Sequence, residues 1–361
     1  MTQITLEKLR KEYRALIAVN DVSLGIEDKS LVTLLGPSGC GKTTTLKMIA
    51  GLIRPTSGKM YFDDKDVTKL VPQERNVGLV FQDYAIFPTM NAYDNIAFGL
   101  RIRRVPKNEL RKRVIEVAEM LRIRDILDVH PGRMTQSEMQ SVALARTLIT
   151  NPTVLLLDEP LSNLDAAFRL RMRAELKRLQ KEINQTVIYV THDQVEALSI
   201  SDKIAVMNFG VLHQYGTSSE IYNHPATYFV SGFIGSPPMN FIDCTFVEKN
   251  GGFLDLGVSK INVSKYSGII KREGEGSEFK MGVRPEDITI SDKAAENFVP
   301  VLVEAYEPLG DEAIVDATLG ETLVRVRTRT TFITTPGETK YIEFDLNKIH
   351  IIDKKTERVI I

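Results

Sequence analysis

The chain has 361 residues, of which 43% are hydrophobic and 26% are charged, which is ordinary globular composition and enough length for two domains. Its 46 basic and 47 acidic side chains give a formal net charge of −1, which argues against a dominant attraction to nucleic acid or anionic lipid. Apolar runs are strand-sized, far short of the roughly 20 residues that span a bilayer, and the first residues lack a signal-peptide core. Cys40 and Cys244 alone imply no disulfide framework, so we expect a reducing cytoplasm.

Short apolar strands alternate with helical patterns as far as residue 235, which predicts an α/β domain with a largely parallel sheet. The expected strands are 31–35, 77–81, 154–158, 187–190 and 204–207, with a helix over 107–121. Segment 235–240 has linker chemistry, so we divide the chain into domains at 1–235 and 236–361. The second domain favours a small antiparallel barrel or sandwich, with strands expected at 301–306, 313–319, 322–327 and 341–346.

The segment from Gly36 to Thr43 follows the pattern G-x-x-x-x-G-K-[ST] between a predicted strand and a helical run. Glycines there let backbone N–H groups wrap phosphates, Lys42 reaches the outer phosphates, and the Thr43 hydroxyl can coordinate Mg²⁺. An accidental glycine-rich turn is the alternative, and the flanking strand and helix argue against it. The predicted nucleotide-binding residues here are Gly36, Pro37, Ser38, Gly39, Cys40, Gly41, Lys42, Thr43 and Thr44.

Polar side chains follow three other predicted strands. Asp158 ends one strand and can hold a Mg²⁺ shell, and the adjacent Glu159 is placed to polarise an attacking water. His192 can contact a γ-phosphate and that water, while the amide of Gln82 can complete the metal or water shell. Either of these two alone is explained equally well as a structural or loop residue. With the phosphate loop upstream, we predict a catalytic set of Lys42, Gln82, Glu159 and His192, and a metal set of Thr43, Gln82 and Asp158.

Together with Ser162–Asp165 and Thr191-His192-Asp193, these motifs resemble the ATP-binding cassette (ABC) proteins, specifically importer ATPase subunits similar to the maltose-transporter ATPase. The resemblance covers nearly the whole chain and extends to 235–241 and 282–288. It implies ATP and Mg²⁺ as cofactors and a P-loop ATPase domain with a helical subdomain. A small β-rich, oligonucleotide-binding-like regulatory domain of the TOBE type would follow.

The resemblance also implies three roles by position. Tyr13 would stack on adenine, although a surface tyrosine that packs on a strand is the alternative. A helical region around 84–98 would form a groove for a membrane subunit, although core packing explains its apolar residues almost as well. Contacts across a dimer interface would come from Ser162, Asn163, Leu164 and Asp165.

The family signature, Leu-Ser-Gly-Gly-Gln at a helix start, is altered to Met134-Thr135-Gln136-Ser137-Glu138, an alignment that the retained 142–146 fixes. In the family this segment caps the γ-phosphate of ATP on the opposite subunit. Side chains at Gln136 and Ser137 obstruct close approach of the backbone. Glu138 adds an anion, and at roughly 5–6 Å with an effective dielectric near 20 the repulsion is about 3 kcal/mol before screening. Rotation of Glu138 into solvent would remove much of that cost.

Two interpretations follow. The chain either forms a homodimer in which the altered segment still works, or it pairs with a non-identical ATPase that has an intact signature. We favour the second, because a homodimer would impair both ATP sites at once.

Expected partners are membrane-spanning permease subunits, the second ATPase and, indirectly, an extracytoplasmic solute-binding protein, with no nucleic acid. The chain would sit at the cytoplasmic face of the membrane as a peripheral subunit and energise uptake of a sugar, polyol or glycerol-phosphate-like solute. The alternatives are a homodimeric importer ATPase for polyamines or inorganic anions, and a soluble ABC ATPase that acts on ribosomes or DNA.

Overall fold

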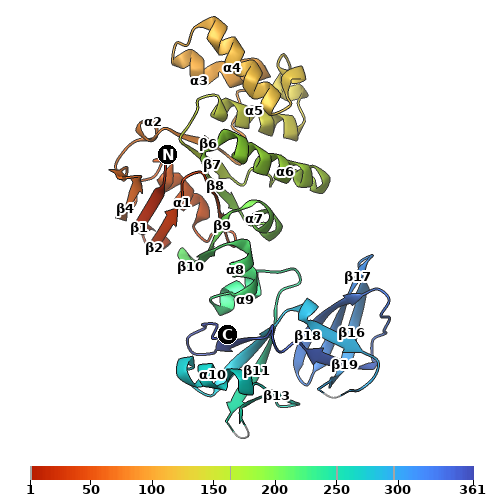
Figure 1. The fold of residues 1–361 in the computed structure, drawn as a ribbon. Helices are drawn as coiled ribbons and strands as arrows, with labels where there is room; N and C mark the ends of the chain where they lie inside the picture. The colour runs from red at the N-terminus through yellow and green to blue at the C-terminus, as the bar shows by residue number, and fades with distance from the viewer. Residues whose placement is uncertain (1, 163, 249–250, 296) are drawn as a thin grey trace. The chain divides into compact units, whose positions relative to one another are not determined.

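The computed structural model describes residues 2–162, 164–248, 251–295 and 297–361. It divides into a compact unit that ends at Ser218 and another that begins at Ser219, coloured red to green and green to blue in Figure 1. Within the described residues, no helix is both long and apolar enough to cross a bilayer.

The central sheet of the first unit consists of β3 (Leu31–Leu35), β6 (Val77–Val80), β7 (Val154–Asp158), β8 (Thr186–Thr191), β9 (Lys203–Asn208) and β10 (Val211–Gly216). Their order is β10-β9-β3-β8-β7-β6, and every pair except β10–β9 is parallel. β3, β7 and β8 are buried throughout, because their sequences are almost unbroken apolar runs. The carboxyl ends of the parallel strands meet at one edge, which is where open α/β sheets bind ligands.

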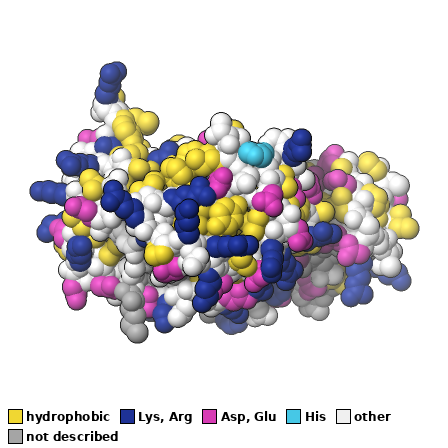
Figure 2. All heavy atoms as spheres, turned by 90° about the horizontal axis from the view of Figure 1, so that it is seen from above, with side chains coloured by type: hydrophobic (Ala, Val, Ile, Leu, Met, Phe, Trp, Pro, Cys, Tyr) yellow, Lys and Arg dark blue, Asp and Glu magenta, His cyan; other side chains and the backbone are white. Residues whose placement is uncertain are grey.

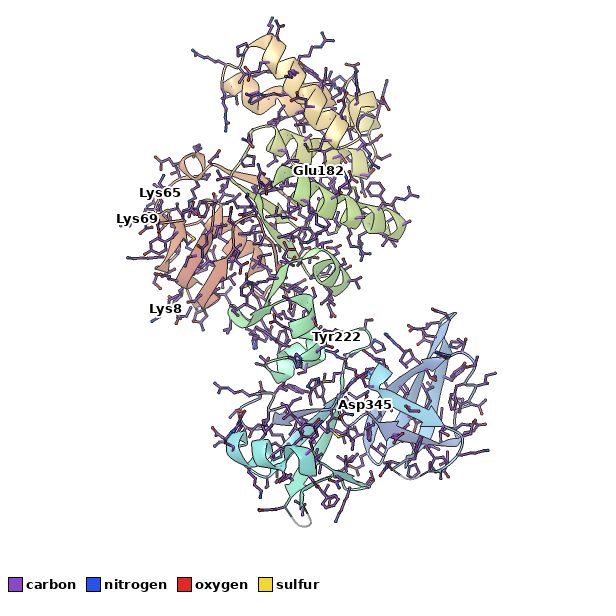
Figure 3. All side chains as sticks on the ribbon, viewed as in Figure 1. Lys8, Lys65, Lys69, Glu182, Tyr222 and Asp345 are labelled. Carbon is purple, nitrogen blue, oxygen red and sulfur yellow. The ribbon has the colours of Figure 1, made fainter. Side chains whose placement is uncertain are left out.

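A smaller antiparallel sheet has the order β2-β1-β4-β5 and consists of β1 (Ile4–Tyr13), β2 (Leu16–Ile26), β4 (Ser57–Phe62) and β5 (Lys65–Asp66). Buried residues of β1 such as Ile4 and Leu6 join the core cluster that includes Val32 of β3. The exposed side chains of Lys8, Lys65 and Lys69 project from this region into solvent (Figure 3). The sheet therefore has one apolar and one solvated side.

The helices of the first unit are α1 (Lys42–Ile49), α2 (Pro72–Arg75), α3 (Ala92–Ile102), α4 (Lys107–Met120), η1 (Arg124–Ile126), η2 (Pro131–Arg133), α5 (Gln136–Leu148), α6 (Ala166–Ile183) and α7 (Gln194–Ile200). The predicted helix over 107–121 corresponds to α4. Ile96 of α3, Val114 of α4 and Val142 of α5 are fully buried in one core cluster, so these three helices form a helical subdomain.

The prediction of helix from residue 84 was wrong, because α3 begins only at Ala92. The preceding segment is a loop held by the buried Asn95, whose Oδ1 accepts from the Phe87 N–H at 2.8 Å. The Asn95 amide donates to the carbonyls of Phe87 (3.1 Å) and Met90 (3.0 Å). Tyr84 is buried in the core, so core packing accounts for this residue.

The second unit contains two antiparallel sheets, in the orders β13-β12-β11-β14-β20 and β15-β19-β16-β17-β18. Their strands are β11 (Asn240–Val247), β12 (Phe253–Asp255), β13 (Lys260–Asn262), β14 (Glu278–Val283), β15 (Ile288–Ser291), β16 (Val299–Pro308), β17 (Glu312–Leu319), β18 (Thr322–Arg329), β19 (Thr339–Phe344) and β20 (His350–Asp353). Both sheets contribute to one core cluster, with Phe279 from the first and Val315 from the second. The helices are α8 (Ser218–Asn223), α9 (Tyr228–Phe233), η4 (Ser264–Tyr266), α10 (Ser267–Glu273) and η5 (Pro285–Asp287).

Alternating arginines on β18 are held by acidic partners. Arg325 Nε lies 2.8 Å from Asp316 on β17, and Arg327 Nε lies 3.5 Å from Glu312. This cross-strand ion pairing explains the alternation as one polar strand face.

Candidate active site

The loop between β3 and α1 requires glycine. Gly41 has a φ of 102°, and a Cβ there would lie 2.3 Å from the Ala18 carbonyl oxygen. The buried Lys42 Nζ donates to the carbonyls of Gly36 (2.7 Å) and Pro37 (2.8 Å). The ammonium is therefore held across the loop, where phosphate oxygens could replace those carbonyls.

Thr43 and Asp158 are brought together from α1 and the end of β7. The Thr43 hydroxyl donates to Asp158 Oδ1 at 2.9 Å. Burial raises the pKa of the Asp158 carboxyl, while the hydrogen bond from Thr43 opposes that rise. A hydroxyl and a carboxylate are hard oxygen donors of the kind that Mg²⁺ prefers, so the pair fits this ion.

Glu159 and His192 meet beside that pair. Glu159 Oε2 lies 3.2 Å from His192 Nδ1, and the Glu159 backbone N–H donates to the Val190 carbonyl at 2.9 Å. The Ser162 hydroxyl donates to the Glu159 carbonyl at 2.9 Å and accepts from Gln82 Nε2 at 3.4 Å. The structure thus gathers predicted residues from the ends of β6, β7 and β8 at one edge of the sheet.

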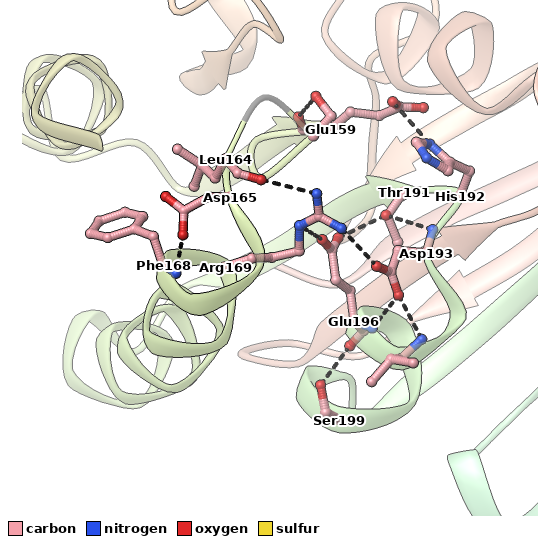
Figure 4. A network of polar contacts seen from close by, with 12 residues as sticks. Glu159, Leu164, Asp165, Phe168, Arg169, Thr191, His192, Asp193, Glu196 and Ser199 are labelled. Atoms are coloured by element: carbon pink, nitrogen blue, oxygen red, sulfur yellow. Dashed lines mark hydrogen bonds and ion pairs between the residues drawn. The ribbon is translucent and has the colours of Figure 1, made fainter. Parts of the chain in front are cut away.

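Arg169, which the sequence analysis missed, connects the turn before α6 to the turn after β8 (Figure 4). Its guanidinium donates to the Leu164 carbonyl at 3.0 Å and to Asp193 Oδ2 at 3.4 Å, and its Nε lies 3.9 Å from the buried Glu196. The hydroxyl of Thr191 also donates to Glu196 at 2.8 Å. Burial raises the pKa of Glu196. The cluster fixes the turn that bears His192, and its only signal in the sequence is an arginine one helical turn after the cap of α6.

The predicted dimer contacts lie just before α6. Asp165 is exposed and caps that helix by accepting from the Phe168 N–H at 3.0 Å. Leu164 is buried in the core, so its side chain packs inside this unit. Asn163 lies outside the described residues.

A hollow of about 370 Å³ adjoins the phosphate loop. It is lined by Tyr13, Leu16, Ile17, Ala18, Ser38, Gly39, Gly41, Lys42, Thr43, Thr44, Glu159 and Phe209. Tyr13 is 43% exposed, and Lys11 Nζ lies 4.9 Å from its ring centroid. The predicted stacking residue therefore borders the same hollow as the loop, together with Phe209, which the sequence analysis missed.

Residues 134–138, which we aligned with the family signature, lie at the start of α5, and Thr135 is the N-cap of that helix. The Thr135 hydroxyl accepts from the Glu138 N–H at 3.3 Å, while the Glu138 carboxylate accepts from the Thr135 N–H at 2.7 Å and hydroxyl at 2.9 Å. Ser137 Oγ is 3.1 Å from Thr135 Oγ1, and Gln136 is exposed. Glu138 is therefore folded onto the start of its own helix and occupies donors that an incoming anion would use.

Comparison with known proteins identifies the chain. It matches the ABC transporter family over residues 19–162, the MalK OB fold domain over 235–288 and the TOBE domain over 281–352. It is 44% identical over 373 aligned positions to the trehalose/maltose import ATP-binding protein MalK of Thermococcus litoralis, with both chains fully covered. The chain belongs to the ABC importer ATPases.

Two further similarities support the same family assignment. The sn-glycerol-3-phosphate import ATP-binding protein UgpC of Psychromonas ingrahamii is 44% identical over 316 residues, 87% of this chain and 82% of that one. A solved dimeric ATP-binding cassette, in a post-hydrolysis state with ADP and Pi, is 29% identical with a TM-score of 0.55, over 60% of this chain and 98% of that chain. The predicted fold class and ATPase activity are confirmed: an ABC domain is followed by OB-fold and TOBE regions.

Proposed function

We propose that this ABC ATPase uses Mg²⁺ and ATP to energise uptake of a sugar, polyol or glycerol-phosphate-like solute. The observation on which the proposed site rests is the meeting of two pairs, Thr43 with Asp158 and Glu159 with His192, beside the phosphate loop. The solute class follows from the trehalose/maltose and sn-glycerol-3-phosphate importers that the chain resembles.

Each residue has a role that its position supports. Lys42 would bind the outer phosphates, and Thr43, Asp158 and Gln82 would hold Mg²⁺, which when bound neutralises charge on the phosphates. Glu159 orients the attacking water and accepts its proton. His192 steadies that carboxylate from 3.2 Å and would also reach the γ-phosphate.

The role of Glu159 has a direct test. Glu159→Gln should retain ATP binding and lose turnover by about a hundredfold or more, because the amide cannot accept the proton. Glu182→Gln is the matched control, since Glu182 is an exposed carboxylate paired with Arg178 on α6. Normal turnover in Glu159→Gln would refute the assigned role.

We also propose that the two ATP sites of the assembled transporter are unequal. Thr135 and Glu138 already hydrogen-bond to each other at the start of α5. Gln136 and Ser137 have side chains at positions where the family has glycine. A partner ATPase with an intact signature would complete the site built on this chain's Lys42. The other ATP site, which is built on the partner's phosphate loop and faces this chain's signature, would be weaker.

The test of unequal sites compares ATP turnover of the purified chain alone, of the chain with a candidate second ATPase from the same operon, and of a variant with Leu-Ser-Gly-Gly-Gln restored at 134–138. Turnover by the chain alone should be weak. It should rise when the partner is added or when the signature is restored. Vigorous, cooperative turnover alone that restoration leaves unchanged would sink the proposal and establish a working homodimer.

The proposed location is the cytoplasmic face of the membrane, on permease subunits served by a solute-binding protein. On the face drawn in Figure 2, Lys and Arg side chains are interspersed with acidic and apolar ones. Copurification of the tagged chain with membrane proteins from detergent extracts is expected. Sedimentation with ribosomes instead would favour a soluble ABC ATPase that acts on them.

A further inference from the structure

Phe209 occupies a tight turn in which other residue types are favoured. β9 and β10 form a hairpin in which Asn208 pairs with Val211, leaving Phe209 and Gly210 as the two-residue turn. Their φ angles are 45° and 78°, and two positive values in such a turn favour Asn, Asp or Gly at both positions. A bulky residue at positive φ is an outlier, so the stability of the turn does not explain Phe209.

Burial does not explain Phe209 either. Its side chain is 86% exposed, the largest exposure among the large apolar side chains of the described residues. An exposed ring in a strained turn contributes little to the core. Backbone outliers of this kind cluster at ligand-binding sites, which points to a role in binding for this phenylalanine.

The turn is fastened to the nucleotide site by its backbone. The Gly210 N–H donates to the Cys40 carbonyl of the phosphate loop at 3.0 Å, and the Gly210 carbonyl accepts from the Asn20 N–H of β2 at 2.8 Å. Phe209 lines the same hollow as Tyr13 and Lys42. Two aromatic side chains from separate hairpins therefore border the space next to the phosphate-binding ammonium.

From this placement we propose that Phe209 is a second aromatic contact for the base of the bound nucleotide, in addition to Tyr13. The proposal rests on the proposed nucleotide site and adds a residue that sets affinity for the base. Aromatic rings stabilise a planar base by stacking and by edge contacts, whereas the triphosphate interacts with the phosphate loop. Phe209 should then affect ATP and leave a ligand without a base untouched.

The experiment uses calorimetric titration of the full-length chain, in the Glu159→Gln background to prevent hydrolysis, with ATP and with inorganic tripolyphosphate. Phe209→Asn should weaken ATP binding by about tenfold and leave tripolyphosphate binding unchanged. Because Asn suits the turn, this variant should melt no earlier than its parent. Phe209→Tyr should bind ATP as the parent does, and Val211→Ala on the same hairpin is the matched control.

Unchanged ATP affinity in Phe209→Asn would overturn the inference, and so would an equal loss for ATP and tripolyphosphate, which would indicate a distorted loop. Lys42→Ala separates this failure from that of the proposed site. If Lys42→Ala binds ATP as the parent does, the nucleotide lies elsewhere, and both proposals are wrong. If Lys42→Ala no longer binds ATP but Phe209→Asn binds ATP as the parent does, the proposed nucleotide site is supported and Phe209 is not part of it.

Discussion

Replacing Glu138 by Gln should improve the response of the chain to ATP, because it removes an anion from the helix start that would face a partner's γ-phosphate. A phosphate that uses the Thr135 N–H and hydroxyl must displace the carboxylate that accepts both. Hydrogen bonds to charged groups contribute roughly 1.5–3 kcal/mol each. Glu138 is only half-buried, so solvent reduces the pair to about 1–2 kcal/mol. Gln keeps the capping geometry but is neutral and is displaced more easily.

At 1.4 kcal/mol per factor of ten, this range predicts a decrease of about five- to thirtyfold in the ATP concentration for half-maximal turnover of the chain alone. ATP-dependent dimerisation, measured by sedimentation in the Glu159→Gln background, should shift by a similar factor. Raising the salt concentration should narrow the difference between the parent and Glu138→Gln only slightly, because the displaced hydrogen bonds are short-ranged. Glu182→Gln serves again as the control.

The reasoning would be refuted if Glu138→Gln left both half-maximal concentrations unchanged while its melting temperature matched the parent. The carboxylate would then move aside at no cost, and the altered signature would function as the family sequence does. A decrease in turnover would also contradict it, since it would mean that the negative charge assists the reaction.

Three further outcomes are expected. Mg²⁺ competes with a proton for Asp158, whose pKa burial raises, so Mg²⁺ affinity measured by titration should fall as the pH drops toward that pKa, and Asp158→Asn should bind Mg²⁺ weakly at every pH. Arg169→Met should lower turnover about tenfold or more with little change in ATP affinity, because it frees the turn held by Asp193 and Glu196, and Arg169→Lys should recover part of the loss. Burial lowers the pKa of His350 below its ordinary value near 6.5, so the unfolded chain binds the extra proton first. Stability to urea should therefore fall as the pH drops below about 7, and His350→Gln should flatten that dependence.

The central strands could be predicted from the sequence because no tertiary contact within the described residues overrides their local apolar pattern. β3 and β7 have almost unbroken apolar sequences, followed by Gly-Pro and by Glu-Pro, and both agree with the predicted limits. Residues 84–91 show the opposite case. The family resemblance implied helix there, but the Asn95 side chain hydrogen-bonds the backbone of Phe87 and Met90 and holds the segment as a loop.

The geometry of the candidate site was predictable where a motif fixes both residue type and location, as for Lys42 after β3 and Asp158 at the end of β7. It was not predictable where the chemistry depends on contacts between distant turns, as for Arg169 with Asp193. For Glu138 we expected a carboxylate near the partner's phosphate or turned into solvent, whereas it accepts hydrogen bonds from Thr135. Thr-x-x-Glu at a helix start is a capping box, and that pattern directs the carboxylate to the helix rather than to solvent.

Glu138 and Phe209 should each have opposite effects on stability and on the response to ATP. The Glu138 carboxylate stabilises the start of α5, so replacing it should cost a little stability while it improves coupling to ATP. Phe209 does the reverse: it strains a turn and exposes a ring, so Phe209→Asn should gain stability while it loses ATP affinity. A purely structural role for either residue predicts that stability and ATP response change in the same direction. Measuring both quantities in both variants therefore separates a functional role from a folding role, and opposite signs are expected in each case.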